Sequence, residues 1–147
     1  WEVLRILQAR YGHVSAERAV CGAGLVDLYQ AVHQLAQSTR RAVQSPAEVT
    51  QRALHDHDPL ALQALDMFCG FLGSVAGDLA LTLGARGGLY IGGGIVPRLG
   101  AWFGQQSTFR ARFEAKGRFQ PYLATIPCWV IDADATPALY GAARALL

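Results

Sequence analysis

The chain has 147 residues, of which 52% are hydrophobic and 16% charged, with a formal net charge of +2. This composition is typical of a single globular, core-rich domain over residues 1–147 and argues against disorder. The arginines are scattered, so no basic stripe predicts binding to nucleic acid or to a membrane surface. Three widely spaced cysteines indicate a reducing, cytoplasmic compartment, and no signal peptide is expected.

The first residues are already helical in pattern. Residues 1–7 have no capping residue before them, so the chain is expected to begin inside a helix and to be the back portion of a longer protein. That helix is predicted to end near Tyr11, with Gly12 in the left-handed closing position. Ser15 is expected to cap a short helix that carries Glu17.

Two longer helices follow in the predicted order of elements. Gly22 and Gly24 are expected to break the chain before a helix with one buried face, marked by apolar residues at positions 25, 28, 32 and 35. Residues 45–48, Ser-Pro-Ala-Glu, combine a capping box with proline at the first helical position and therefore predict a helix start.

The longest predicted helix begins at Asp58-Pro59 and ends near Gly84. One of its stripes is apolar and includes Leu79 and Leu83, and a second stripe holds small residues at positions 70, 73 and 77. Glycine costs roughly 1 kcal/mol per residue inside a helix, so we expect this second face to be covered tightly by another backbone. The segment is long enough to span a membrane, but it contains two aspartates, and a helix buried against a sheet fits better.

The last third of the chain predicts two strands among short helices. A strand over residues 89–93 runs into a glycine cluster, and a helical turn follows Pro97. Ser107 is expected to cap a helix that Gly117 ends, and residues 126–131 have the pattern of a strand buried on both faces. Thr136-Pro137 should start a final helix. Helices predominate, and the strands are too few for a complete sheet.

The glycine cluster at residues 92–94 is the strongest candidate for a ligand site. Glycines at the end of a strand let the backbone turn and let a ligand touch the main chain. The dinucleotide fingerprint fails because Pro97 stands at its third glycine position, and the P-loop fails because Gly93 stands where lysine is required. A sugar or a base against bare backbone is the more plausible ligand, and a tight strand-to-helix turn is the simpler alternative.

Glu17 is the carboxylate of greatest interest, because it lies near a helix start between glycine-rich bends. It is either a fixed acceptor for ligand hydroxyls or a carboxylate whose charge is simply stabilised by the helix dipole. The other polar candidates have simple structural explanations. These are a turn histidine at His13, a helix cap at Asp58 beside His55, Asp56 and His57, a basic helix end at Lys116 and Arg118, and loop carboxylates at Asp132 and Asp134.

Several motifs in order resemble the bacterial glucokinases along essentially the whole chain. They are Gly12-His13-Val14-Ser15-Ala16-Glu17-Arg18, Gly22-x-Gly24-Leu25-Val26, Gly93-Gly94-Ile95-Val96-Pro97-Arg98, the segment 109–119, Ile126-Pro127 and Leu139-Tyr140-Gly141-Ala142. Gly92 replaces a residue that is often alanine in that family, a mild departure.

The resemblance implies an α/β fold: the helix-rich carboxy-terminal part of an actin-like, ribonuclease-H-like ATPase lobe with few strands. It implies ATP- and Mg²⁺-dependent phosphorylation of the glucose 6-hydroxyl, with a homodimer as the expected assembly. Glu17 would match the glutamate that receives sugar hydroxyls, and Gly93 and Gly94 would match the glycines that lie against the adenosine.

The resemblance also implies that no catalytic residue lies in this chain. The family's first phosphate turn, its aspartate base, its Glu-x-x-His sugar motif and its second phosphate turn would all precede Trp1. The chain alone is therefore expected to be inactive and to need the missing amino-terminal part of the kinase as its partner. Two alternatives stay open: a sugar-binding regulatory module of the same family, and a structural or dimerising domain.

Overall fold

The computed structural model describes residues 1–132 and 137–146. Its elements, in chain order, are α1 (Glu2–Tyr11), α2 (Ala16–Ala19), α3 (Gly22–Leu35), α4 (Pro46–Leu54), α5 (Pro59–Leu83), β1 (Leu89–Ile91), the 3-10 helix η1 (Val96–Leu99), α6 (Ala101–Gln105), α7 (Phe109–Glu114), the 3-10 helix η2 (Gly117–Phe119), α8 (Gln120–Ala124), β2 (Cys128–Val130) and α9 (Pro137–Ala145). The helix-rich fold class with few strands is confirmed.

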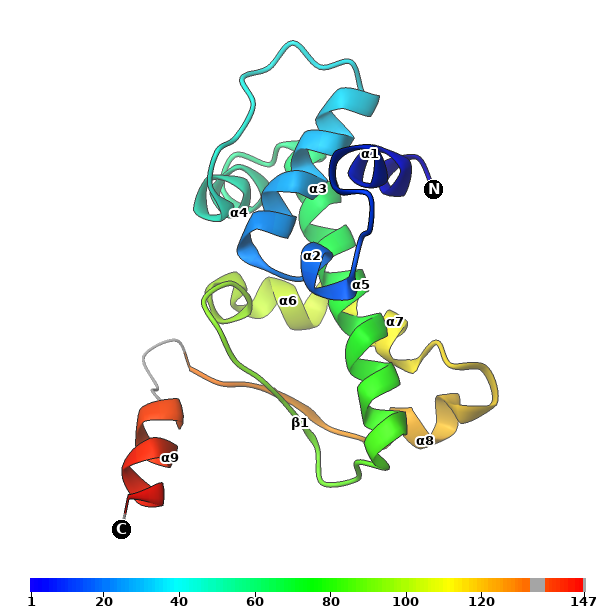
Figure 1. The fold of residues 1–147 in the computed structure, drawn as a ribbon, viewed down its shortest axis with the longest axis vertical. Helices are drawn as coiled ribbons and strands as arrows, with labels where there is room; N and C mark the ends of the chain where they lie inside the picture. The colour runs from blue at the N-terminus through cyan, green and yellow to red at the C-terminus, as the bar shows by residue number, and fades with distance from the viewer. Residues whose placement is uncertain (133–136, 147) are drawn as a thin grey trace.

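Helix α5 runs along the length of the molecule, with α1, α3 and α4 around one half and α7, α8 and the strands around the other (Figure 1). Its start and end follow the sequence prediction. The Asp58 side chain accepts a hydrogen bond from the Leu60 N–H at 2.9 Å, and Gly84 closes the helix in the left-handed conformation at φ 61°.

The glycine face of α5 is covered tightly, as expected. A Cβ atom at Gly73 would overlap the Phe109 carbonyl oxygen, and one at Gly77 would overlap that of Phe113. The backbone of α7 therefore lies directly on this face, which only glycine permits. The expected burial against a sheet is wrong, because α5 packs mainly against α3, α4 and α7.

The partners of α5 also explain an error in the predicted apolar stripe. The small-residue face carries the contacts with α7, so Leu79 and Leu83 near the end of the helix are left 50% and 70% exposed. Helix α5 is long and apolar enough to cross a membrane, but half of its most apolar window is buried within the protein. Its contacts are those of a core helix.

The sheet that the structure describes consists of β1 and β2, which pair in parallel with Leu89 opposite Cys128 and Ile91 opposite Val130. The prediction that residues 126–131 are buried on both faces is wrong, since Trp129 and Val130 are exposed. The described sheet of two strands is not enclosed between layers that would bury both of its faces. Trp129 instead stacks on Tyr90 with ring centroids 4.9 Å apart.

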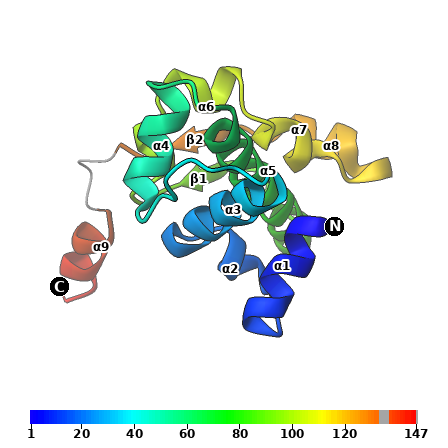
Figure 2. The same ribbon diagram turned by 90° about the horizontal axis from the view of Figure 1, so that it is seen from above.

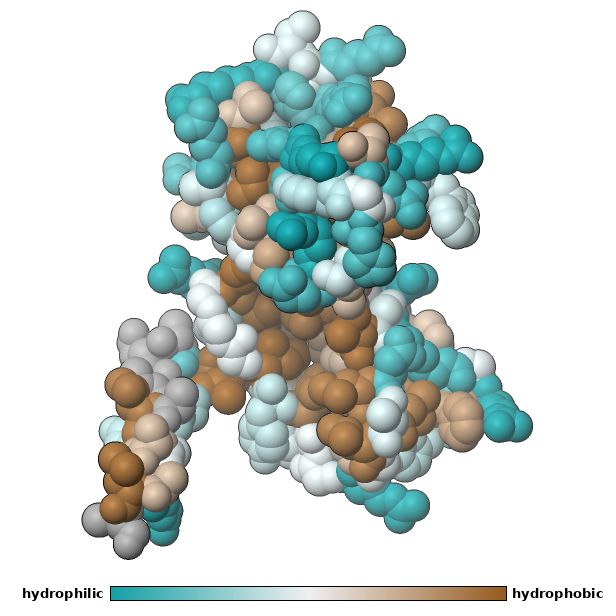
Figure 3. Space-filling view, in the orientation of Figure 1, coloured by the Kyte–Doolittle hydropathy of each residue, from teal (hydrophilic) through white to brown (hydrophobic). Residues whose placement is uncertain are grey.

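Part of the surface is predominantly hydrophobic. Figure 3 shows a hydrophobic area over the half of the molecule that holds the end of α5 and the strands, whereas polar residues cover much of the half with α1, α3 and α4. The large exposed hydrophobic residues of α5 and the two strands are Phe71, Leu79, Leu83, Tyr90, Trp129 and Val130. Tyr90 and Trp129 lie opposite each other and stack on one side of the two strands, whereas Val130, the next residue of β2, points to the other side. We call the exposed pair Tyr90 and Trp129 the apolar face.

Three predicted turns differ from the structure. Gly22 and Gly24 do not break the chain, because α3 starts at Gly22 and Gly24 lies in its first turn. Thr108, not Ser107, is at the N-cap of α7, although the Ser107 hydroxyl accepts a 3.4 Å hydrogen bond from the Phe109 N–H. Helix α7 ends at Glu114, and Gly117, with φ 55°, begins η2 instead of ending α7.

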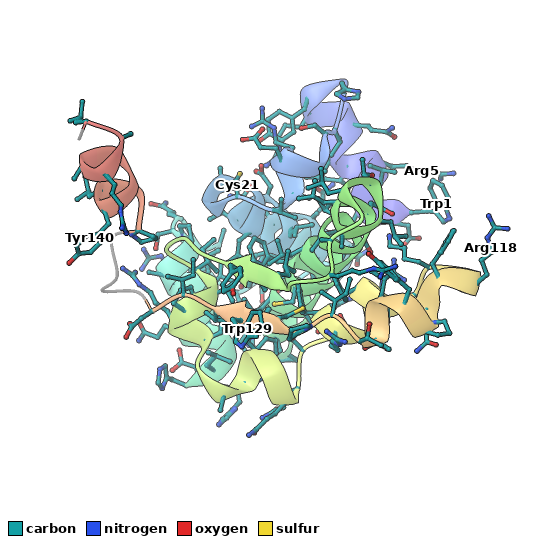
Figure 4. The ribbon with its side chains drawn as sticks, turned by 90° about the horizontal axis from the view of Figure 1, so that it is seen from below. Trp1, Arg5, Cys21, Arg118, Trp129 and Tyr140 are labelled. Atoms are coloured by element: carbon teal, nitrogen blue, oxygen red, sulfur yellow. The ribbon has the colours of Figure 1, made fainter. Side chains whose placement is uncertain are left out.

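The last described element lies apart from the rest of the molecule. Figures 1 and 4 show α9 away from the other helices, and Tyr140 on it is 76% exposed. The final helix is confirmed from Pro137 onward, whereas Thr136, its expected cap, lies outside the described residues.

Candidate functional site

Glu17 is held at the start of a turn of helix that follows a sharp reversal of the chain. Gly12 has φ 72° and ψ −72°, and the His13 N–H bonds to the Tyr11 carbonyl at 2.8 Å. This is a γ-turn rather than the expected left-handed cap, and it needs glycine because of its positive φ. Ser15 then caps α2, as predicted, by accepting a 3.3 Å hydrogen bond from the Arg18 N–H.

The Glu17 side chain is exposed on α2. Among the described residues it has no hydrogen-bond or ion-pair partner. A carboxylate whose backbone is held in a helix and whose oxygens are not used by the protein can accept hydrogen bonds from ligand hydroxyls. The predicted acceptor role is compatible with this arrangement and stays a prediction.

The glycine bend, residues 92–94, follows β1 and is open on its outer side. Gly93 has φ 107°, a backbone conformation that requires glycine. Gly94 has no such φ, and a Cβ atom built on it would meet nothing within 4 Å. Neither backbone conformation nor crowding by the protein therefore explains glycine at position 94, and the main chain there is open to the outside.

Gly94 lines a cavity of about 440 Å³ between the glycine bend and α4. Ile95 and Arg98 lie on the same wall as Gly94, and Thr50, Gln51 and His55 form the opposite one. The cavity thus offers bare backbone and apolar surface on one side and polar side chains on the other, the usual composition of a small-molecule site. Sequence reasoning missed Arg98 and His55 as lining residues, although Arg98 belongs to the motif that starts at Gly93.

Glu17 does not line this cavity, nor any of four further cavities that residues 3–132 form. Figures 1 and 2 show α2 on one side of α3 and α4 on the other. The starts of α3 and α4 are in contact, because a Cβ atom at Gly22 would lie 3.3 Å from Pro46 Cγ. Pro46 itself lines the cavity at Gly94. A crevice shared by Glu17 and the glycine bend stays a prediction.

The other polar candidates are explained by local structure. His13 is exposed in the γ-turn, and Asp58 caps α5 and forms a 3.0 Å ion pair with Arg40. Lys116 pairs with Asp78 at 2.7 Å, and Asp132 lines a small cavity near η1. Asp134 lies outside the described residues.

Possible metal ligands and the cysteine thiols are the remaining groups that could support chemistry. Over the described residues, no three His, Cys, Asp or Glu side chains cluster so as to hold a metal ion. Burial raises the pKa of the Cys69 thiol to about 12, and burial also raises the pKa of Cys128 although the Arg110 guanidinium opposes the shift. These two thiols are therefore protonated at neutral pH and are poor nucleophiles.

Comparisons with known proteins agree with the fold and with the motifs. The structure of glucokinase from an Antarctic psychrotroph superposes with a TM-score of 0.84 and 36% identity, covering 99% of this chain and 44% of that one. The glucokinase of Aromatoleum aromaticum is 57% identical over 145 residues, which are 99% of this chain and 43% of the relative. A glucokinase of Neisseria meningitidis serogroup B is 52% identical over 137 residues, 93% of this chain and 41% of the relative.

The fold is thus that of the carboxy-terminal part of a sugar kinase. The Glucokinase family model matches residues 1–147, and the chain belongs to the glucokinase family. It spans less than half the length of the relatives that it matches.

Proposed function

We propose that this chain is the carboxy-terminal portion of a kinase that transfers the γ-phosphoryl group of ATP to the 6-hydroxyl of glucose. In this proposal the chain forms a single domain. It supplies one sugar contact, Glu17, and the adenosine contacts, Gly93 and Gly94. The observation that carries the proposal is the family match over the whole chain together with a ligand-sized cavity at Gly94.

Glu17 serves as a fixed hydrogen-bond acceptor for hydroxyl groups of the sugar. Its carboxylate is exposed and has no partner among the described residues, so it loses no internal hydrogen bond when a sugar binds. A site of this kind discriminates strongly against an analogue that lacks the hydroxyl, because the carboxylate is then left unpaired.

The glycine bend receives the nucleoside part of ATP. A cavity of about 440 Å³ is of the size that small-molecule sites have, and the open space beside Gly94 lets a flat ring or a ribose approach the main chain. Gln51 and His55 on the opposite wall can hydrogen-bond to polar edges of the ligand.

The groups that act on the phosphates are assigned to the amino-terminal part of the kinase. Mg²⁺ bound with ATP would neutralise charge during phosphoryl transfer. In this proposal the Mg²⁺ ligands, like the base, belong to the amino-terminal part of the kinase. The apolar face supports such a division, because exposed surface of this kind usually packs against another part of a protein. The homodimer stays a prediction.

The test is glucose-dependent formation of ADP. We expect none from the 147-residue chain alone. We expect activity when the chain is joined to the amino-terminal portion of its Aromatoleum aromaticum relative. Turnover by the chain alone would overturn the division of labour. A folded chimera that binds glucose but forms no ADP would instead favour a sugar-responsive regulatory protein.

A further inference from the structure

A buried carboxylate fixes the end of the helix that precedes the Glu17 segment. Asp27 lies in α3 and is only 7% exposed. Its two oxygens accept hydrogen bonds from different residues: Oδ1 from Arg10 Nη1 at 2.6 Å and Oδ2 from the Tyr11 hydroxyl at 2.7 Å. Both donors belong to the last two positions of α1. Asp27 therefore anchors the point at which the chain leaves α1 for the γ-turn at Gly12.

The Tyr11 ring links this anchor to the far end of the same segment. The guanidinium of Arg18 lies 4.3 Å from the centre of that ring, a distance that allows a cation–π interaction. Tyr11 immediately precedes Gly12, and Arg18 immediately follows Glu17. The contact thus closes a loop of residues 12–17 across its base.

The backbone of α2 is also seated on α3, close to Asp27. A Cβ atom at Gly24 would overlap the Arg18 carbonyl oxygen, so glycine permits this close approach. The Cys21 thiol, at the junction of the two helices, accepts a 3.3 Å hydrogen bond from the Gly24 N–H (Figure 4). Glu17 is thereby placed by the close approach of the Arg18 backbone to Gly24 of α3 and by the Arg18–Tyr11 contact, and Asp27 holds Tyr11.

We propose that Asp27 is a positioning residue for sugar binding, which acts through the Tyr11 hydroxyl and the Tyr11–Arg18 contact to hold the backbone from which the Glu17 carboxylate reaches the sugar. This inference rests on the proposed function of Glu17. The hydrogen bonds from Arg10 and Tyr11 compensate the burial of this carboxylate, and Tyr11 leads directly into the Gly12 turn and the loop. Asp27 itself touches no ligand in this proposal.

The experiment uses the complete kinase and three single variants: Tyr11→Phe, Asp27→Asn and Glu17→Gln. Tyr11→Phe removes one oxygen atom, keeps the ring against Arg18 and alters a side chain that is 37% exposed, so it should fold. We expect Tyr11→Phe and Asp27→Asn each to raise the KM for glucose roughly three- to tenfold, with kcat and the KM for ATP nearly unchanged. Glu17→Gln should raise the glucose KM more than either.

A double variant separates positioning from general damage to the fold. In the Glu17→Gln background, Tyr11→Phe should have no further effect on the KM for glucose, because both changes act on one contact. Asp58→Asn is the matched control: Asp58 is equally buried and ion-paired, but it caps α5 away from α2. It should lower the melting temperature and leave the glucose KM as it is.

Each outcome has a separate meaning. If Glu17→Gln leaves the KM for glucose unchanged, the proposed function of Glu17 fails, whatever Asp27 does. If Glu17→Gln raises the KM but Tyr11→Phe and Asp27→Asn lower only stability or kcat, Asp27 is structural and the inference is overturned. A full additional effect of Tyr11→Phe on the Glu17→Gln background overturns it as well.

Discussion

Replacing Gly73 by alanine should destabilise the protein even though alanine is the better helix former. The new methyl group would overlap the Phe109 carbonyl oxygen of α7, well inside the 3.0 Å that real Cβ contacts essentially never cross. That carbonyl would have to retreat by more than 1 Å to reach an ordinary van der Waals distance. Overpacking costs about 1–3 kcal/mol, and a backbone atom that must move this far places the site in the upper part of that range, at about 2–3 kcal/mol. The helical preference for alanine recovers roughly 1 kcal/mol of it.

Gly70→Ala on the same face of α5 is the control. Its methyl group would meet the Thr108 hydroxyl at 3.0 Å, and that side chain can rotate away. Urea and thermal denaturation should therefore show a net loss of about 1–2 kcal/mol for Gly73→Ala, equivalent to roughly 2–8 °C in Tm, and a neutral or small effect for Gly70→Ala. Equal stability of the two variants would refute the close contact between α5 and α7.

Three other predictions address the nucleotide site, the stability of the fold at acid pH and the apolar face. Gly94→Ala should raise the KM for ATP of the complete kinase, measured by steady-state kinetics, without lowering its Tm. Gly87→Ala, which also places its methyl group in open space, should leave both the KM and the Tm unchanged. A backbone hydrogen bond from Gln44 lowers the pKa of Glu48, with a further contribution from Arg52. This lowered pKa contributes to the free energy of unfolding above the ordinary pKa of 4.5, and the contribution is lost as the pH falls through the pKa of Glu48 in the folded protein. Glu48→Gln should therefore make the free energy of unfolding fall less steeply toward acid pH. The isolated chain should self-associate through the apolar face, and Tyr90→Lys should reduce this in sedimentation velocity; a monomer at all concentrations would count against that role of the face.

Much of the fold could be predicted because its signals are local. The capping residues Ser15, Ser45 and Asp58 and the closing Gly84 mark helix ends through their own side chains or dihedral angles, and all four are confirmed. The stripe of small residues on α5 also predicted close packing by another backbone. Its partner, α7, could not be named, because the pairing depends on segments that are far apart in the sequence.

The errors come from residues whose environment is set by distant contacts. Gly24 has the signature of a chain break, but its glycine is required by the carbonyl of Arg18 and not by its own dihedral angles. Trp129 and Val130 have the pattern of a doubly buried strand, yet the described sheet ends beside them. The Asp27–Tyr11 hydrogen bond gave no signal, since nothing in a single sequence relates residues 16 positions apart.

Glucose affinity of the Glu17→Gln variant tests the central claim most directly. Isothermal titration of the complete kinase with glucose should show a loss of about 10- to 100-fold, the effect of removing a charge-assisted hydrogen bond. Glu2→Gln, a change of the same kind at an exposed position of α1, should bind glucose as the unaltered protein does. Glucose binding by Glu17→Gln that equals that of the unaltered protein would contradict the assignment of the sugar contact to Glu17.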